Sequence, residues 1–155
     1  MKFLCDQMLG TLAKWLRLFG FDVFYSNDRL SDDELIKIAV KEKMTIISRD
    51  KELIKRSEKQ NLTTIFIKTI VLDEQLVKVA SISPIEEKKI LTRCNLCNTI
   101  IENIDKSDVE GSVPIKVFEN NDEFWYCKKC KKYYWRGTHY DKIIKKYIDL
   151  KKKHQ

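Results

Sequence analysis

The stretch KFLCDQMLGTLAKWLRLFG, residues 2–20, decides the fold class of this chain. Its first part, residues 2–5, is a short apolar run that stops at Asp6, as a buried strand does. Between Met8 and Phe19 the apolar residues recur at the i, i+3, i+4, i+7 spacing of an amphipathic helix, which Gly20 ends. The stretch therefore predicts a buried strand followed directly by a helix.

The same alternation continues as far as residue 79. Short apolar or β-branched runs predict strands at 22–25, 45–48 and 63–68. A helical pattern follows each of them: one begins at Ser31 or Asp32, one begins at Asp50, and one covers 72–79. This order is typical of an α/β fold in which helices cover the faces of a parallel sheet.

A change of composition at residues 81–89 marks a domain boundary, because Ser, Pro, Glu and Lys replace the apolar pattern there. We expect a first domain over residues 1–82 and a smaller module over 90–155. The tail of that module, from residue 141, is rich in lysine and predicts a basic helix. So short a module buries little apolar surface, and it needs a metal, a disulfide or docking onto its neighbour.

The smaller module contains two Cys-x-x-Cys pairs, which are separated by the 29 residues 98–126. Each pair presents two thiolates on one side of a turn, and two such turns complete a tetrahedral zinc site with Zn–S distances of about 2.3 Å. The pattern predicts a structural zinc ribbon; a redox dithiol, two disulfides and an iron–sulfur cluster are the alternatives. The expected ligands are Cys94, Cys97, Cys127 and Cys130. The fifth cysteine, Cys5, lies in an apolar strand and is expected to be a small core residue.

Four aspartates are candidate catalytic residues. Asp6 and Asp50 each follow a predicted strand, and active sites of parallel sheets lie at the carboxyl ends of the strands. Asp32 and Asp33 lie at the start of a predicted helix. Carboxylates can hold the Mg²⁺ or Mn²⁺ that assists phosphodiester hydrolysis. Helix capping is the alternative for Asp32 and Asp33, and for Asp50 capping and metal binding are compatible.

The chain is basic, with 30 Lys and Arg against 23 Asp and Glu, a net charge of +7 and a pI near 9.1. This charge favours an anionic partner such as nucleic acid or an acidic membrane surface. Trp135, Arg136 and His139 are candidates for stacking on bases and pairing with phosphates, although Trp135 could instead pack against the zinc module. Without a signal-peptide pattern or an apolar run near the ~18 residues of a membrane span, we expect a soluble cytoplasmic protein.

Seven segments of the chain match, in the same order, the motifs of a known family: 3–22, 32–39, 46–50, 74–76, 93–98, the second cysteine pair and 134–139. Together they resemble the mut-seven C-terminal RNase domain family, a PIN-like group, and the resemblance covers roughly residues 1–148. Ser48 stands where the family usually has Thr, and Thr138 stands where it usually has Ser, so both hydroxyls are retained.

The resemblance implies a PIN-like nuclease domain with an appended zinc ribbon, and a metal-dependent, endonucleolytic ribonuclease activity. Asp6 and Asp50 would be ligands of Mg²⁺ or Mn²⁺, with Asp32 or Asp33 as a third and Asp73 or Glu74 as a fourth acidic group. Lys14, Arg17 and Arg49 would contact RNA phosphates or balance the acidic charge. The expected partner is RNA, with tRNA and rRNA as candidates, and PIN-like domains often form homodimers.

Two other functions fit the same residues. A non-catalytic RNA- or ribosome-binding zinc-ribbon protein would use the same basic surface and keep the aspartates as capping residues. A protein-interaction module would dock a partner through the ribbon. Salt dependence separates binding to RNA from the protein-interaction module, because phosphate contacts weaken steeply with salt.

Overall fold

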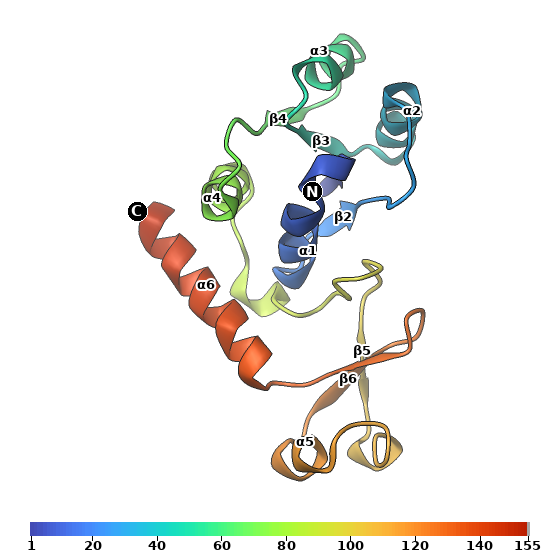
Figure 1. Cartoon of the computed structure of the whole chain (residues 1–155), viewed down its shortest axis with the longest axis vertical. Helices are drawn as coiled ribbons and strands as arrows, with labels where there is room; N and C mark the ends of the chain where they lie inside the picture. The colour runs from blue at the N-terminus through green and yellow to red at the C-terminus, as the bar shows by residue number, and fades with distance from the viewer. Residues whose placement is uncertain (155) are drawn as a thin grey trace.

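The first half of the chain forms a four-stranded parallel sheet (Figure 1). The structure is a computed structural model, and it describes residues 1–154. The strands pair in the order β2-β1-β3-β4, and every pair is parallel. The predicted α/β class with a parallel sheet is therefore confirmed. The strands are β1 (Lys2–Cys5), β2 (Asp22–Phe24), β3 (Thr45–Ser48) and β4 (Thr64–Phe66).

Helices cover both faces of this sheet, because successive side chains of each strand point to opposite faces. Phe3 of β1 packs with α1 (Gly10–Leu18) and α4 (Leu72–Ile82). Leu4, the next residue, packs with α2 (Asp32–Glu42) and α3 (Lys51–Lys59). A short 3-10 turn, η1 (Gln7–Leu9), joins β1 to α1. The result is a three-layer arrangement with the sheet between two helical layers (Figure 1).

The strand order reverses beside β1, since β2 lies on one side of it and β3 on the other. In open α/β sheets such a reversal marks the place, at the carboxyl ends of the two central strands, where ligands bind, and we call this place the crevice. Cys5 pairs with Ile47, so Asp6 and Ser48 come next on the two strands. The residues that directly follow β1 and β3 therefore lie at this crevice.

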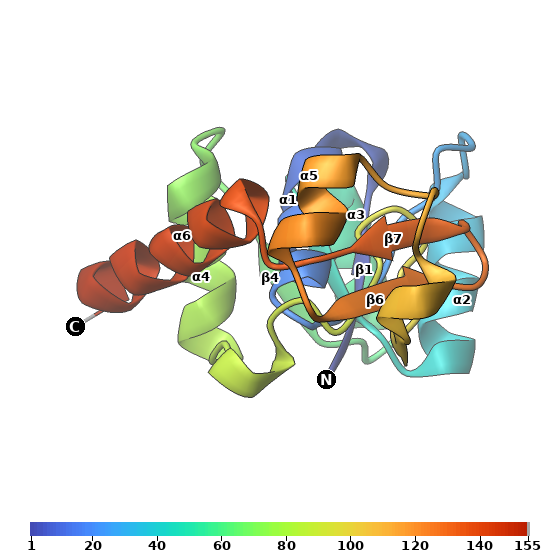
Figure 2. The ribbon, with the colours of Figure 1, turned by 90° about the horizontal axis from the view of Figure 1, so that it is seen from below.

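The second half of the chain begins with a small antiparallel sheet in the order β5-β6-β7. We call this part, residues 93–137, the ribbon. Figure 2 shows β6 and β7 side by side, with α5 and the start of α6 beside them. Its elements are β5 (Glu102–Ile104), η3 (Lys106–Asp108), α5 (Ile115–Asn120), β6 (Phe124–Cys127) and β7 (Lys132–Tyr134), and η2 (Glu87–Lys89) precedes it.

The last helix, α6 (Thr138–His154), leaves the ribbon and packs against α4. Its buried Ile143 and Leu150 belong to the core that contains Phe3. The apolar stripe of this helix is covered by the first domain, so the expected module 90–155 docks onto its neighbour through α6. The expected domain boundary itself stays a prediction. Of the helices within residues 1–154, none combines the length and the apolar character that crossing a bilayer requires.

The ribbon covers the outer edge of β2. The Val23 N–H donates to the side-chain oxygen of Asn98 at 3.0 Å, and the Val23 carbonyl accepts from Arg17. The same Arg17 guanidinium donates to the carbonyls of Asn95 and Leu96 in the first cysteine turn, at 3.3 and 3.1 Å. The unpaired N–H and C=O groups of an edge strand can pair with other chains. These contacts satisfy such groups of β2 and attach the ribbon to the sheet.

Gly20, at the end of α1, permits close approach of the segment that leads to the ribbon. Its φ of +89° lies in the region that favours glycine. A Cβ at this position would lie 2.2 Å from the carbonyl oxygen of Lys89. The Leu91 N–H donates to the Leu18 carbonyl beside this contact, at 2.8 Å. A residue with a side chain cannot be placed at position 20 without moving the linker, the segment 87–92 that leads to the ribbon.

We predict that Gly20→Ala lowers the free energy of unfolding by more than Gly111→Ala does. Gly111 also has a positive φ, of +81°, but no atom lies within 4 Å of a Cβ placed there. The control should therefore lose only the backbone term of about 1–2 kcal/mol, whereas Gly20→Ala should lose this and the cost of displacing the linker. Urea unfolding of both variants measures the difference. Equal losses would contradict the close contact between position 20 and the linker.

Candidate active site and metal centre

Asp6 is the buried carboxylate of the crevice between β1 and β3. Its side chain is 6% exposed. The sequence places it there because the apolar run of β1 ends at residue 5 and Asp6 caps the turn that follows. One carboxylate oxygen accepts the Met8 N–H at 2.9 Å, and the other accepts the hydroxyl of Ser48 at the end of β3. The side chain is thus held at a fixed place on the sheet edge.

Ser48 connects the two aspartates that follow the central strands. It is fully buried, and its hydroxyl donates to Asp6 while accepting the N–H of Asp50 at 2.9 Å. Asp50 caps α3 by accepting the Glu52 N–H at 2.9 Å, and its side chain is exposed. The predicted capping role of Asp50 is confirmed. The bridging role of Ser48 was not predicted, although a hydroxyl at the last position of a buried strand was a visible signal.

The surroundings of Asp6 disfavour its negative charge. Burial raises the pKa of its carboxyl above the ordinary value, and the nearby charge of Asp50 raises it further. The hydrogen bonds from Ser48 and from the Met8 amide act in the opposite direction, and burial prevails. A cation beside Asp6 would relieve this cost.

Arg49 follows Ser48 and lines a cavity of about 230 Å³ at the same edge of the sheet. Its Nε atom is buried and has no hydrogen-bond partner within residues 1–154. Gln75, at the start of α4, lines the same cavity and donates to the Thr69 carbonyl at 2.9 Å. Arg49 thus follows β3 directly, and its contact with a phosphate or with the acidic charge stays a prediction.

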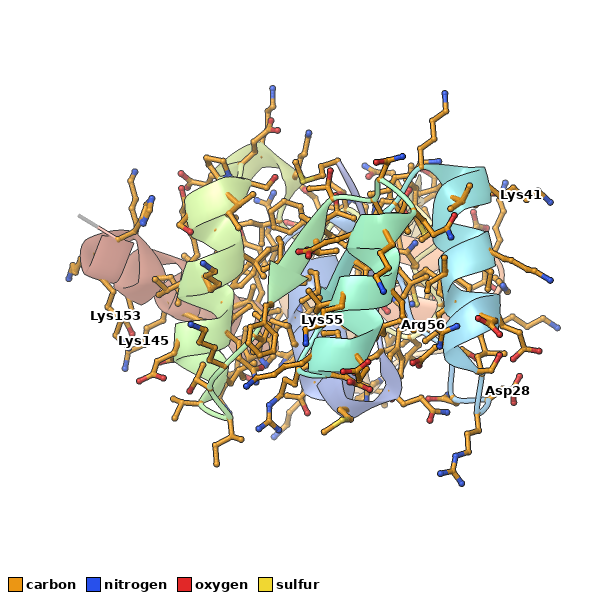
Figure 3. The ribbon with its side chains drawn as sticks, turned by 90° about the horizontal axis from the view of Figure 1, so that it is seen from above. Asp28, Lys41, Lys55, Arg56, Lys145 and Lys153 are labelled. Carbon is orange, nitrogen blue, oxygen red and sulfur yellow. The ribbon has the colours of Figure 1, made fainter. Side chains whose placement is uncertain are left out.

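Asp32 and Asp33 both pair with a basic residue of α3. They lie in the first turn of α2, which Ser31 caps with Glu34 in a capping box. Arg56 of α3 pairs with both carboxylates, at 3.4 Å for Asp32. Figure 3 shows Arg56 between the two helices. The structure thus does not gather the four predicted aspartates into one cluster.

Three other predicted residues also have structural partners. Arg17 is 5% exposed, and its guanidinium is committed to backbone carbonyls of β2 and the ribbon. These bonds give Arg17 a structural role, and they do not support its predicted contact with an RNA phosphate. Asp73 pairs with Lys146 at 2.6 Å and with Lys153 at 3.0 Å, whereas Glu74 bonds to the Thr69 hydroxyl. Lys14 of α1 is exposed and remains free for an anion.

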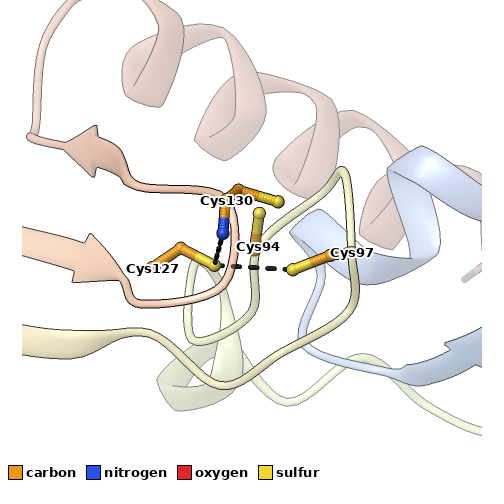
Figure 4. A group of neighbouring side chains, drawn as sticks. All are labelled: Cys94, Cys97, Cys127 and Cys130. Atoms are coloured by element: carbon orange, nitrogen blue, oxygen red, sulfur yellow. Dashed lines mark hydrogen bonds between the residues drawn. The ribbon is translucent and has the colours of Figure 1, made fainter.

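The four ribbon cysteines converge on one point (Figure 4). Their sulfur atoms all lie within 4.8 Å of one another, and within residues 1–154 they are the only group of three or more potential metal ligands that is so close. The Cys97 and Cys127 sulfurs are 3.4 Å apart, well beyond the ~2.05 Å of a disulfide. The cluster is consistent with the predicted zinc ribbon and could hold a zinc ion.

The four thiols of the cluster do not ionise equally. Burial raises the pKa of the Cys97 thiol, but its hydrogen bonds with Thr99 and with neighbouring cysteines outweigh this and lower it to about 6. The pKa of Cys130 rises to about 12, first through its contact with Cys97 and then through burial. The Tyr134 hydroxyl donates to the Cys94 sulfur at 3.0 Å. Four thiolates this close need a cation, so the donor set fits a soft divalent metal.

The predicted RNA contacts of the ribbon lie at a second cavity, which we call the junction cavity. It measures about 600 Å³, and Trp135 and Arg136 both line it. His139 is exposed and does not line the cavity. Trp125 and Tyr140 do, and sequence reasoning missed them because neither stands in a recognisable motif. The linker segment 87–92 forms the opposite wall.

These features define a class of protein: an α/β domain with an acidic sheet edge, to which a four-cysteine ribbon is attached. Residues 1–147 match the family described as the Mut7-C RNAse domain. The chain therefore belongs to this family, as the sequence motifs indicated. Neither the curated proteins nor the solved structures gave a match to this chain. Membership of an RNase family points to a nuclease-type function.

We predict that Asp6→Asn stabilises the protein near neutral pH. A raised pKa in the folded state means that the carboxyl adds stability below its ordinary pKa, and that this stability is lost as the pH rises through the raised value. Asn carries no charge, keeps one oxygen for the Met8 N–H, and its amide group can donate to the Ser48 hydroxyl in place of the bond that Asp6 accepts. The gain at neutral pH should be about 1.4 kcal/mol for each unit of pKa shift, and it should vanish in acid.

Urea unfolding between pH 3 and pH 8, with zinc as the only divalent ion, measures this effect. Asp28→Asn is the matched control, because Asp28 is exposed on the loop before α2 (Figure 3) and its replacement removes the same charge. The control should change stability little and without the same pH dependence. If Asp6→Asn were less stable than the parent protein at every pH, ionisation of the Asp6 carboxyl would not lower the free energy of unfolding.

Proposed function

We propose that this chain is a ribonuclease that depends on Mg²⁺ or Mn²⁺ and has Asp6 and Asp50 as its catalytic residues. The observation that carries the proposal is the position of Asp6: a buried carboxylate with a raised pKa, beside a second aspartate, at the switch point of a sheet in an RNase family. Perturbed carboxylates in such crevices are typical of functional sites.

The residues of the crevice fit a hard divalent cation. Mg²⁺ is usually held by one or two carboxylates and completes its shell with water and phosphate oxygens. Asp6 and Asp50 offer two carboxylates, and the conflict between burial and charge at Asp6 is what a cation would relieve. We leave Asp32 and Asp33 out of the proposed ligand set, because both are paired with Arg56.

A divalent ion at this place would supply an activated water and relief of charge on the phosphate during hydrolysis. The protein's own residues would do the rest. Ser48 fixes the orientation of Asp6 through its hydroxyl bond. Arg49, with its buried and unpaired Nε, would bind a phosphate oxygen of the RNA beside the acidic pair. Lys14 would add a second positive charge on α1.

We also infer that the ribbon binds one structural zinc ion through its four cysteines. The cluster leaves no open position for a substrate, so the metal would serve the fold. Binding would stabilise the turns whose carbonyls hold Arg17, and through Arg17 the edge of the parallel sheet. A zinc site made of four thiolates is typical of a reducing compartment, so a cytoplasmic location is part of this proposal.

Cys127→Ser should lose the bound zinc and lower the melting temperature of the whole chain, because ribbon and sheet share the contacts of Arg17. Cys5→Ala is the control: it removes a cysteine of the sheet core, where the thiol is 1% exposed and lies outside the cluster. That variant should keep one zinc ion per chain although it loses some core packing. Metal content measured on purified protein decides the matter, and a Cys127→Ser protein with full zinc would overturn the assignment.

Asp6→Asn and Asp50→Asn should each slow the Mn²⁺-dependent cleavage of single-stranded RNA by about a thousandfold, equivalent to about 4 kcal/mol of transition-state stabilisation. Asp28→Asn, which removes an exposed charge near the same edge, should cleave at the parent rate. Asp32→Asn should lose little activity, since its carboxylate is engaged by Arg56. Cleavage at the parent rate by Asp6→Asn would rule out the proposed site.

A non-catalytic RNA- or ribosome-binding protein is the second candidate function. It is favoured by the net charge of +7 and by the pairing of Asp32 and Asp33 with Arg56, which leaves only two aspartates at the crevice. The cleavage assay separates the two functions. A protein that binds RNA in a salt-dependent manner and does not cleave it with any divalent ion would belong to this second class.

A further inference from the structure

The junction cavity has the composition of a site for a single-stranded nucleic acid. Trp125, Trp135 and Tyr140 supply aromatic rings, and Arg136 supplies a cation. Proteins that bind single strands combine aromatic rings, on which bases stack, with basic groups that follow the backbone. A volume of about 600 Å³ is within the range of small-ligand sites and is enough for one nucleotide.

Arg136 is held in place before any ligand arrives. Its guanidinium lies over the Trp125 ring and over the Tyr140 ring, with 5.5 Å to each ring centroid. No carboxylate within residues 1–154 forms an ion pair with it, and its side chain is exposed. An oriented and unneutralised guanidinium is suited to a phosphate, which it can bind through two parallel hydrogen bonds.

The ring of Trp135 is also fixed. A Cβ at Gly137 would lie 2.8 Å from its indole nitrogen, so the ring packs directly against the backbone of that glycine. The indole is half-buried and forms part of the cavity wall. A ring that is held by its own chain loses little entropy when a base stacks on it.

Basic side chains outnumber acidic ones on α6, which leads away from the cavity. The helix begins two residues after Arg136 and carries exposed Lys142, Lys145 and Lys152, of which Lys145 is labelled in Figure 3, and it also carries exposed Asp141 and Asp149. An RNA backbone that leaves the cavity in this direction would remain beside basic side chains.

We propose that the junction cavity binds one unpaired nucleotide of the RNA substrate, with its base on the indole of Trp135 and its phosphate on Arg136. The proposal rests on the proposed function in one respect, that the substrate is RNA. It makes the ribbon and α6 a substrate-positioning surface separate from the Asp6 crevice. A base-paired strand would bind less well, because its bases are stacked within the duplex and cannot enter the cavity.

The test measures binding of a short fluorescein-labelled oligouridylate by fluorescence anisotropy, in the zinc-loaded full chain carrying Asp6→Asn to prevent cleavage. Arg136→Glu and Trp135→Leu should each weaken binding at least about fivefold, the lower end of a lost stacking or charged contact. Lys116→Glu, an equal charge change on the exposed face of α5, should weaken it less than about twofold. Trp135→Phe keeps a ring and should fall between the parent and Trp135→Leu.

Equal losses for Arg136→Glu and Lys116→Glu, or parent affinity in Trp135→Leu and Trp135→Phe, would overturn the proposal. Equal affinity of the parent chain for a duplex of the same length would overturn it as well.

Cleavage is scored separately, with Asp6 restored: Arg136→Glu should raise KM and leave kcat near the parent value. If the oligonucleotide depends on Arg136 and Trp135 but is never cleaved, the cavity assignment stands and the nuclease assignment fails. If the RNA is cleaved but its binding does not depend on Arg136 and Trp135, the nuclease assignment stands and the cavity assignment fails.

Discussion

The parallel pairing of β1 with β3 is the constraint on which both the fold and the acidic crevice depend. It sets the strand order that creates the switch point, and it brings Asp6 and Ser48 out of the sheet side by side. The hydroxyl of Ser48 then joins the end of β1 to the start of α3, because it also accepts the Asp50 N–H. A shift of the pairing by one residue would turn every side chain of one strand to the opposite face and separate these groups.

The ribbon is attached to this sheet by polar contacts at one edge and by an apolar helix at the other side. Arg17 and Asn98 satisfy the outer edge of β2, while α6 returns from the ribbon to cover α4. A small module with few buried residues gains a fixed orientation in this way. The same arrangement creates the junction cavity, whose walls come from the linker, the ribbon and the first turn of α6. The contacts that attach the ribbon to the first domain therefore also form the cavity that is proposed to bind RNA.

Much of the fold could be predicted from the sequence because its elements are local patterns. The apolar runs and their breakers located β1, β3 and the two aspartates that follow them, and the Cys-x-x-Cys spacing located the sulfur cluster. The misjudged residues depend on partners far along the chain. Arg17 resembles a free basic residue until its contacts 78 and 79 positions away are known. The docking of α6 and the pairing of Arg56 with α2 could not be predicted for the same reason. An apolar stripe or a charged side chain in the sequence does not specify which distant element it will contact.

The metal site proposed at Asp6 and Asp50 can be observed in a crystal. In crystals of the zinc-loaded protein grown with Mn²⁺, anomalous diffraction at wavelengths that distinguish manganese from zinc should show a manganese peak in contact with the Asp6 and Asp50 carboxylates and a separate zinc peak among the four cysteines. A fully occupied manganese site elsewhere, or no manganese at the crevice while both carboxylates keep their present hydrogen bonds, would rule out this site.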